Sequence, residues 1–208
     1  MSDYAVAGDD TLSVSLGAPT SDRLLLAFLY RLDDDDSGFV PGLSVAGAPT
    51  DEIIAARASQ PFIPPNSFRA QAFHLVDASS SGAIDFVTAI PAGSNGLHLL
   101  AVYEFGGADG ASPIGAVATK SGFGEDQTYA LATTAPDSFV AAGFIGVRPP
   151  GTPAPGFLVD IDHDIAAAGF YLAWAGSRPT TAAASYPVGV TLPSGSGGAG
   201  CAIEIKAA

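Results

Sequence analysis

The sequence predicts an all-β protein, a two-sheet antiparallel β-sandwich with about a dozen strands and little helix. Apolar residues alternate with a period of two along several short segments, as they do on a strand with one buried face. Glycine and proline, 25 and 16 of the 208 residues, are spread along the chain as turn residues between these segments. No window has the pattern of a long amphipathic helix, and Thr50–Ser59 is the best short candidate, with Thr50 as its N-cap.

The expected strands follow one another at similar intervals. Arg23–Arg31 is a continuous apolar run between two arginines, which is typical of a strand buried on both faces. Asn95 and Gly96 both tolerate positive φ, so Ala83–Ile90 and Leu97–Phe105 are predicted to form a hairpin. The other expected strands are Arg69–Val76, Ser138–Val147, Phe157–Ile165, Gly169–Ala175, Tyr186–Leu192 and Cys201–Lys206, with weaker ones near Thr11–Leu16, Leu43–Ala46, Ile114–Thr119 and Thr128–Ala132.

A single domain is expected to span residues 1–208, because no break in composition divides the chain. The Pro/Gly-rich segment Val147–Gly156 is interpreted as a loop within that domain. The net charge of −13 argues against nucleic acid and anionic lipid as partners. Apolar runs such as Ile165–Gly176 are too short for membrane insertion, and Met1–Asp10 lacks the features of a signal peptide, so synthesis in the cytoplasm is expected.

Motifs that could carry catalysis or cofactor binding are weak. Gly195–Gly200 matches G-x-G-x-x-G, but a short strand and not a helix is expected after it, so it is interpreted as a turn before the last strand. His74, His98 and His163 lie far apart and have no metal-ligand spacing. Cys201, the one cysteine, is interpreted as a small core residue.

Two acidic clusters leave alternatives open. Asp33–Asp36 could offer oxygens to Ca²⁺, although a solvated loop tip is the more frequent outcome for such a run. Asp160, Asp162 and Asp164 alternate and are predicted to share one strand face. An EF-hand is excluded there, because its sixth and twelfth positions are isoleucine and tyrosine. Ca²⁺ binding at either cluster, and a carboxylate pair for glycoside hydrolysis at the second, stay open.

Aromatic residues are few. Phe170, Leu172 and Trp174 share a strand face that is predicted to be core. Tyr129 and Tyr186 are the candidates for an exposed platform on which a sugar could stack.

The glycine-rich stretch after Leu97–Phe105 is interpreted as a corner of the sandwich. Gly106 and Gly107 let the chain leave the sheet sharply, Asp109 can cap the turn, and Pro113 precedes the next strand at its edge. Glu104 and Asp109 are the only groups of this corner that could act as a base.

Phe73–Gly115 resembles a β-sandwich module of structural proteins of tailed phages and gene transfer agents, which also recurs in some bacterial surface proteins. The shared pattern is a strand, a short Ser-Gly turn, a hairpin, and then a strand that ends in an aromatic-Gly loop with an acid and Pro-Ile-Gly. Matching strands in DRLLLAFLYR and TTAPDSFVAAGFIGV extend the resemblance over most of Thr20–Gly176. The resemblance implies a jelly-roll-like fold and brings no catalytic residues.

The expected function is therefore that of a non-enzymatic structural protein of a phage or phage-like particle: a head decoration, a spike or a tail-surface component located in the virion. The resemblance implies a homo-oligomer that contacts other capsid or tail proteins, and a contact with host surface polysaccharide stays open. No catalytic, cofactor-binding or metal-binding residue and no cofactor is expected.

The alternative is a carbohydrate-binding module of a bacterial surface or secreted protein, which predicts an exposed aromatic platform and Ca²⁺ at Asp33–Asp36. A third hypothesis, a glycan hydrolase or lyase, would depend on Asp160 and Asp162 facing one groove.

Overall fold

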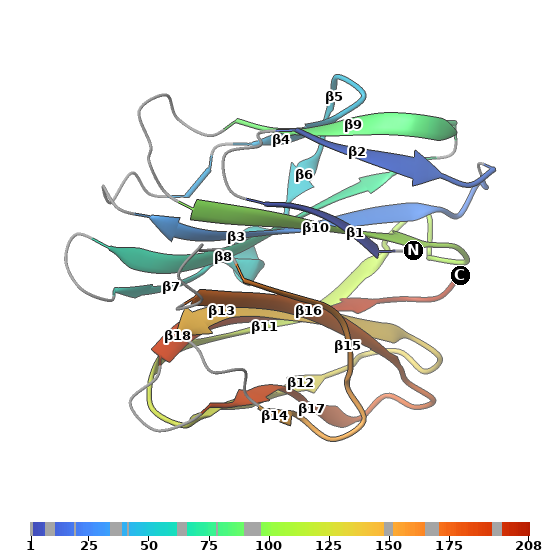
Figure 1. Ribbon diagram of the computed structural model, residues 1–208. Helices are drawn as coiled ribbons and strands as arrows, with labels where there is room; N and C mark the ends of the chain where they lie inside the picture. The colour runs from blue at the N-terminus through green and yellow to red at the C-terminus, as the bar shows by residue number, and fades with distance from the viewer. Residues whose placement is uncertain are drawn as a thin grey trace.

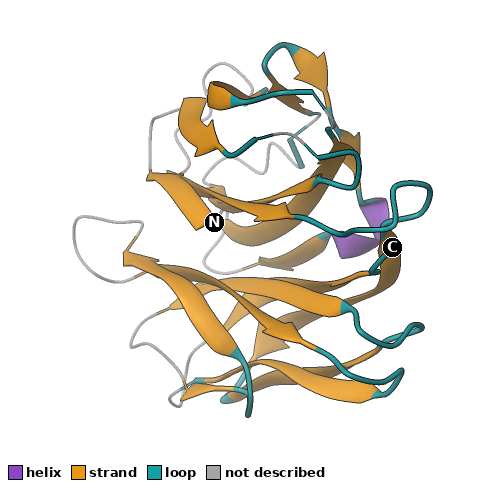
Figure 2. Cartoon of the chain, turned by 90° about the vertical axis from the view of Figure 1, so that its right-hand side faces the viewer, coloured by secondary structure: helices purple, strands orange, loops and turns teal. Residues whose placement is uncertain are grey.

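A computed structural model describes residues 2–6, 11–18, 20–33, 39–40, 42–61, 66–77, 79–89, 97–147, 152–164, 171–192 and 197–208 (Figure 1). Strands dominate these residues and their pairings are antiparallel, so the predicted all-β fold is confirmed. Within the described residues, helix is limited to one 3₁₀ turn, η1 (Ile54–Ala56) (Figure 2). None of the helical structure described is long and apolar enough to cross a membrane.

The first half of the chain forms two sheets. The N-terminal outer sheet has the order β2 (Thr11–Leu16), β9 (Gly82–Thr88), β4 (Leu43–Val45), β5 (Ala48–Pro49). The N-terminal inner sheet has the order β1 (Ser2–Val6), β10 (Leu97–Phe105), β3 (Leu24–Asp33), β8 (Ser67–Val76), β6 (Asp51–Glu52), and β7 (Ala58–Pro61) also pairs with β8.

The second half forms two more sheets. The C-terminal inner sheet has the order β11 (Ile114–Phe123), β18 (Gly197–Ile205), β13 (Phe139–Val147), β16 (Tyr171–Pro179), β15 (Leu158–Asp164). The C-terminal outer sheet consists of β12 (Asp126–Ala132), β17 (Ser185–Thr191) and β14 (Thr152–Pro153), in that order. Figure 1 shows the four sheets stacked as layers, with the two inner sheets facing each other.

Three apolar clusters lie between the four layers. The central one joins the inner sheets, with Phe28 and Tyr30 from β3 against Ala141 and Ile145 from β13. A second cluster lies under the N-terminal outer sheet and a third under the C-terminal outer sheet. Each inner sheet is therefore covered on both faces, which explains why its middle strands, β3 and β13, are nearly continuous apolar runs.

The apolar run Arg23–Arg31 shows this arrangement directly. Leu24, Leu26, Phe28 and Tyr30 face the central cluster, whereas the residues between them face the N-terminal outer sheet. The prediction of a strand buried on both faces is confirmed.

Two sequence predictions differ from the structure in number and in pairing. The described residues form four sheets and not two. They also contain more strands than the predicted dozen, because some strands have only two or three residues and are too short to show a period of two. The predicted hairpin is wrong: β9 pairs with β2 and β4, whereas β10 pairs with β1 and β3 in another sheet. A turn signal fixes where the chain reverses but not whether both strands stay in one sheet.

Two further segments differ in conformation. The helix candidate Thr50–Ser59 contains β6, η1 and part of β7, and the Thr50 hydroxyl bonds the Leu43 carbonyl (2.8 Å) instead of capping a helix. Of the predicted turn Gly195–Gly200, residues 195–196 lie outside the described residues, and the other four, three glycines and Ala199, begin the buried strand β18. The Phe144 and Phe123 rings occupy the space that side chains at Gly198 and Gly197 would need, so these glycines allow close packing.

Candidate functional site

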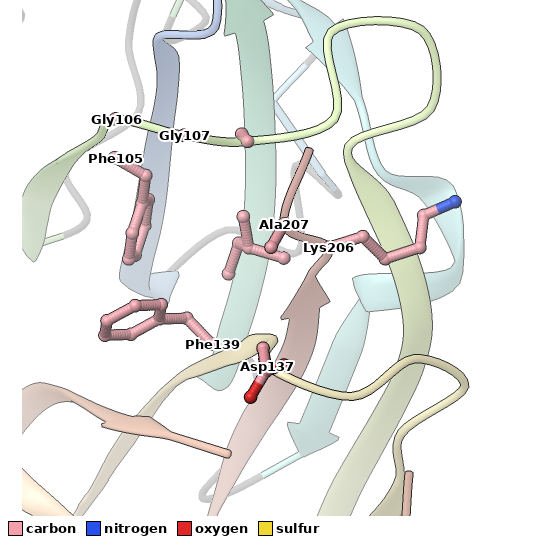
Figure 3. Close-up of a pocket in the computed structure, with 9 residues that line it drawn as sticks. Phe105, Gly106, Gly107, Asp137, Phe139, Lys206 and Ala207 are labelled. Carbon is pink, nitrogen blue, oxygen red and sulfur yellow. The ribbon is translucent and has the colours of Figure 1, made fainter. Parts of the chain in front are cut away.

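A depression lies at the end of the molecule where β10 ends and β13 begins. Phe105 closes β10 and Phe139 opens β13, and their ring centroids lie 5.7 Å apart across the boundary between the inner sheets (Figure 3). Phe139 is 42% exposed. We call the two rings and the hollows beside them the aromatic groove.

Two hollows flank the rings. The first, of about 220 Å³, is lined by Gly106–Ala108, Asp137 and Ile205–Ala207 (Figure 3). The second, of about 340 Å³, is lined by Tyr103, Glu104, Gly106, Asp160 and Ser177. Both hollows border Phe105, Gly106 and Phe139, so they form one surface that runs over the phenyl rings.

Carboxylates surround the rings of the aromatic groove. Asp137 is exposed and has a left-handed backbone (φ 52°), which aspartate tolerates better than most residues. The Asp160 carboxylate accepts a hydrogen bond from the Ser177 hydroxyl (3.0 Å). Lys206 turns its ammonium away from the rings and toward Ser112 (2.6 Å), so the surface beside the rings is acidic (Figure 3).

Glu104, the acid of the predicted corner, has a structural partner. Its carboxylate lies 3.3 Å from the Arg23 guanidinium, which is 2% exposed and also forms an ion pair with Asp77 (3.2 Å). Burial alone would raise the pKa of Asp77, but hydrogen bonds from the backbone N–H groups of Ser79 and Ser80 outweigh it and lower the pKa to about 2. These contacts join the start of β3 to the ends of β8 and β10.

The corner itself has the predicted geometry. Gly107 has positive φ (75°), and the Asp109 carboxylate accepts hydrogen bonds from the N–H groups of Ala111 (2.9 Å) and Ser112 (3.2 Å). Pro113 directly precedes β11, an edge strand. The interpretation of this stretch as a capped corner is confirmed.

The two acidic clusters of the sequence are only partly described. Asp33 ends β3, and Asp34–Asp36 lie outside the described residues. In β15 the register shifts between Val159 and Ile161, so the bulge at Asp160 interrupts the alternation from which one shared carboxylate face was predicted. Asp162 and Asp164 pair with β16 through their backbones. Among the described residues, no three His, Cys, Asp or Glu side chains gather closely enough to hold a metal ion.

The remaining candidates from the sequence lie apart from the groove or in the core. Cys201 is fully buried, and burial raises the pKa of its thiol to about 12, so the prediction of a core residue is confirmed. His98 is buried on β10, whereas His74 on β8 is half-buried, with Nδ1 3.2 Å from the Asp51 carbonyl oxygen. His163 lies on β15, where its backbone pairs with Ala173.

The predicted aromatic platform is not formed by the tyrosines. Burial raises the pKa of Tyr129, whose hydroxyl is enclosed, and Tyr186 lies under the Arg178 guanidinium (4.9 Å) with its hydroxyl bonded to Ala182. An exposed aromatic ring does lie at the groove, where Phe139 pairs with Phe105, and Phe123 is exposed elsewhere. The sequence could not show this pair, because Phe105 and Phe139 also fit the apolar pattern of a strand end.

A buried carboxylate on β18 also escaped the sequence analysis. Glu204 is fully buried and accepts hydrogen bonds from the N–H groups of Ala116 (2.8 Å), Thr134 (2.9 Å) and Ala135 (2.9 Å) and from the Ser138 hydroxyl (3.1 Å). Burial would raise its pKa, but these hydrogen bonds lower it. Glu204 therefore ties the loop before β13 to β11 and is structural.

Comparison with protein-family models, curated proteins and solved structures finds no match to this chain. The resemblance to particle modules of phages and gene transfer agents thus rests on the sequence motifs.

Proposed function

We propose that this protein is a non-enzymatic structural component of a phage or phage-like particle, located in the virion as a head decoration, spike or tail-surface protein. The observation that carries this proposal is the four-layer stack of antiparallel sheets. Along the chain, strands alternate between an inner and an outer sheet, as they do in the jelly rolls of capsid proteins. The stack buries both faces of its inner sheets.

The chemistry of the aromatic groove supports a binding role over a catalytic one. Ser177 borders the groove and is the only serine of its described lining. Its hydroxyl donates a hydrogen bond to the Asp160 carboxylate and not to a histidine that could activate it as a nucleophile. Glu104 accepts a hydrogen bond from the buried guanidinium of Arg23, which also binds the carbonyls of Asp77 and Gly17. General acid–base catalysis needs groups free to exchange protons with a substrate.

We further propose that the particle contains several copies of the chain, because paired or covered edges protect a β-protein from uncontrolled edge-to-edge association. β1 and β15 form one edge of the facing inner sheets, and β7 and β11 form the other. These edges are the candidate contacts with neighbouring copies or with other capsid or tail proteins.

The experiment is peptide mass spectrometry on gradient-purified particles from the producing culture. We expect the chain to band with capsid and tail proteins at a fixed stoichiometry that survives washing in high salt. A chain found only in the soluble or cell-surface fraction would overturn the particle assignment.

A second candidate, a carbohydrate-binding module, is favoured by one observation: the exposed Phe139 ring is flanked by the Asp137 and Asp160 carboxylates and the Ser177 hydroxyl. An apolar ring face beside hydrogen-bond acceptors is the combination that a sugar ring can use. On a glycan array, this function predicts binding that Phe139→Ala abolishes and that Phe123→Ala, a change at an exposed phenylalanine elsewhere, leaves intact. Binding that both variants retain, or no binding at all, would exclude the groove as a glycan site.

A further inference from the structure

The two halves of the chain build their sheets in the same strand order. The first half forms β1-β10-β3-β8 and β2-β9-β4, and the second forms β11-β18-β13-β16 and β12-β17-β14 (Figure 1). Taken in chain order, each of these seven strands in the first half has a counterpart in the second. The edge strands are also equivalent. In the first half β6 and β7 pair with the outer side of β8, and in the second half β15 pairs with β16, the counterpart of β8.

The register of the pairings is also repeated. In each inner sheet, the first residue of the middle strand pairs with the last residues of both of its neighbours. In each outer sheet, the last residue of the first strand pairs with the first residue of the strand beside it. These pairs are Leu24 with Val76 and Phe105, Phe139 with Pro179 and Ile205, Leu16 with Gly82, and Ala132 with Ser185.

One backbone hydrogen bond outside the sheets recurs at equivalent positions. The N–H of Asp77, directly after β8, donates to the carbonyl of Arg23, directly before β3 (3.1 Å). The N–H of Thr180, directly after β16, donates to the carbonyl of Ser138, directly before β13 (2.8 Å). The same junction is therefore built twice.

A polar contact is repeated at this junction with altered chemistry. Glu104 and Glu204 are each the second-last residue of their strand, β10 and β18. Glu104 accepts from the Arg23 guanidinium (3.3 Å), and Glu204 accepts from the hydroxyl of Ser138, the counterpart of Arg23 (3.1 Å). A glutamate in the same place, bound by the residue before the same strand, is not required by an all-β fold.

The halves meet in a reciprocal way. β1 packs against β15 at one edge, and their counterparts β11 and β7 pack against each other at the other edge. β3 and β13, which are counterparts, pack against each other in the middle. This exchange of roles gives the facing strands the order that they have in an isologous interface, in which a two-fold axis relates both partners. The two-fold relation is approximate, because β8 and β18 approach each other more closely than their counterparts β16 and β10.

We propose that the chain is a tandem repeat of one jelly-roll-like unit, residues 2–105 and 114–205, arranged as a covalently linked pseudo-two-fold dimer. The inner face of the unit is its self-association surface, and its partner is a second copy of the unit. This proposal rests on topology, register and contacts and does not depend on the proposed particle function.

The two faces have since become complementary in size. At the centre of the interface, large side chains of the N-terminal face meet small ones of the C-terminal face, whereas Ala70, Ala72 and Ala101 on the first face and Ile145, Ile203 and Ile205 on the second do not follow this division. The large ones are Leu24, Leu26, Phe28, Tyr30 and Phe68, and the small ones are Ala141, Gly143, Ala173, Ala175 and Ala199. A Cβ at Gly143, the counterpart of Phe28, would overlap the Tyr30 hydroxyl. Two N-terminal faces would therefore clash, and two C-terminal faces would leave a cavity.

The first test cuts the whole chain between its halves. A protease site is inserted between Gly110 and Ala111, which are both exposed, and the cleaved protein is unfolded, separated and refolded. We expect the mixed fragments to re-form a 1:1 complex with the native circular dichroism spectrum, and neither fragment alone to form a dimer of the same stability. Fragments that fail to recombine, or that self-associate as well as they pair, would overturn the complementary interface.

The second test does not need isolated fragments to fold. Val117 is the counterpart of Ser2, because each pairs with the third-last residue of the neighbouring strand, β18 or β10. A two-fold axis would therefore make the path from Phe105 to Val117 equivalent to the path from Ile205 to Ser2. In a circular permutant, the chain is opened between Gly110 and Ala111. A linker with as many residues as separate Phe105 from Val117 then joins Ile205 to Ser2. This permutant should melt within a few degrees of the natural chain. The matched control shortens that join by half and should melt clearly lower. Equal melting of both permutants, or failure of both, would refute the two-fold equivalence.

Discussion

Arg23 joins Glu104, at one side of the aromatic groove, to the polar groups that follow β8. Its guanidinium is buried and contacts the carbonyls of Asp77 (3.0 Å) and Gly17 (3.3 Å), the carbonyl of Ser80 and two carboxylates. A buried charge is tolerated only with such a set of partners, and removing it leaves the partner charges uncompensated.

We expect Arg23→Met to lower the free energy of unfolding by about 3–5 kcal/mol, because Asp77 and Glu104 lose their buried counter-charge. Lys206→Met, at a more exposed and longer ion pair with Asp109 (3.9 Å), should lower it by less than about 1 kcal/mol. Chemical denaturation of both variants measures the difference. Similar losses in both would show that the Arg23 pairs are no stronger than surface pairs.

Asp77 should make stability depend on pH in the acid range. Its pKa is about 2 in the folded state, below the ordinary value of 3.8, so the folded state binds its proton less tightly than the unfolded chain. The stabilisation is therefore present above the unfolded pKa and is lost as the pH falls from about 4 to about 2. Denaturation between pH 5 and pH 2 should show a steeper loss for the natural protein than for Asp77→Asn. Parallel curves would contradict this role.

At the scale of elements, the packing of β3 against β13 depends on one glycine. The Tyr30 ring fills the space above Gly143, and among the described residues its hydroxyl has no hydrogen-bond partner. Full burial raises the pKa of Tyr30, so it stays protonated at all ordinary pH values.

We expect Gly143→Ala to destabilise the protein by about 1–3 kcal/mol or more, because the added methyl overlaps the tyrosine ring. Tyr30→Leu in the same chain should recover part of the loss, so the double variant should be more stable than the sum of both changes predicts. Gly106→Ala, at an exposed glycine whose added Cβ contacts nothing, is the control. Additive effects in the double-mutant cycle would show that the two residues do not limit each other.

At the scale of the whole molecule, the central cluster decides whether the halves unfold together. It draws on β3, β8 and β10 from the first half and on β13, β16 and β18 from the second. Neither half can expose its inner face without opening this cluster, so the single domain predicted from the sequence should behave as one cooperative unit.

Calorimetry should therefore show one transition whose calorimetric and van't Hoff enthalpies agree. The Gly143→Ala variant should move this transition to lower temperature without splitting it. Two separate transitions in the natural protein would mean that each half folds without the other and would refute the single-domain prediction.

The sequence by itself determined the strands and their burial. The period of two and the spacing of glycine and proline identify most strands, and the run Arg23–Arg31 reveals a sheet covered on both sides before any partner is known. Asp109 as a turn cap and Cys201 as a core residue also follow from local chemistry, because the contacts concerned lie within a few residues or depend only on side-chain type.

Only the tertiary structure decided which strands are neighbours. Periodicity shows which face of a strand is buried but carries no information about the strand that lies beside it, so the hairpin of Ala83–Ile90 with Leu97–Phe105 was wrong and the four sheets were missed. The Phe105–Phe139 pair, the Arg23 cluster and the fit of Tyr30 to Gly143 join residues far apart in the chain. The repetition of the halves was invisible for the same reason, because strand order and register preserve it, whereas the side chains at equivalent positions differ, with arginine (Arg23) against serine (Ser138) and phenylalanine (Phe28) against glycine (Gly143).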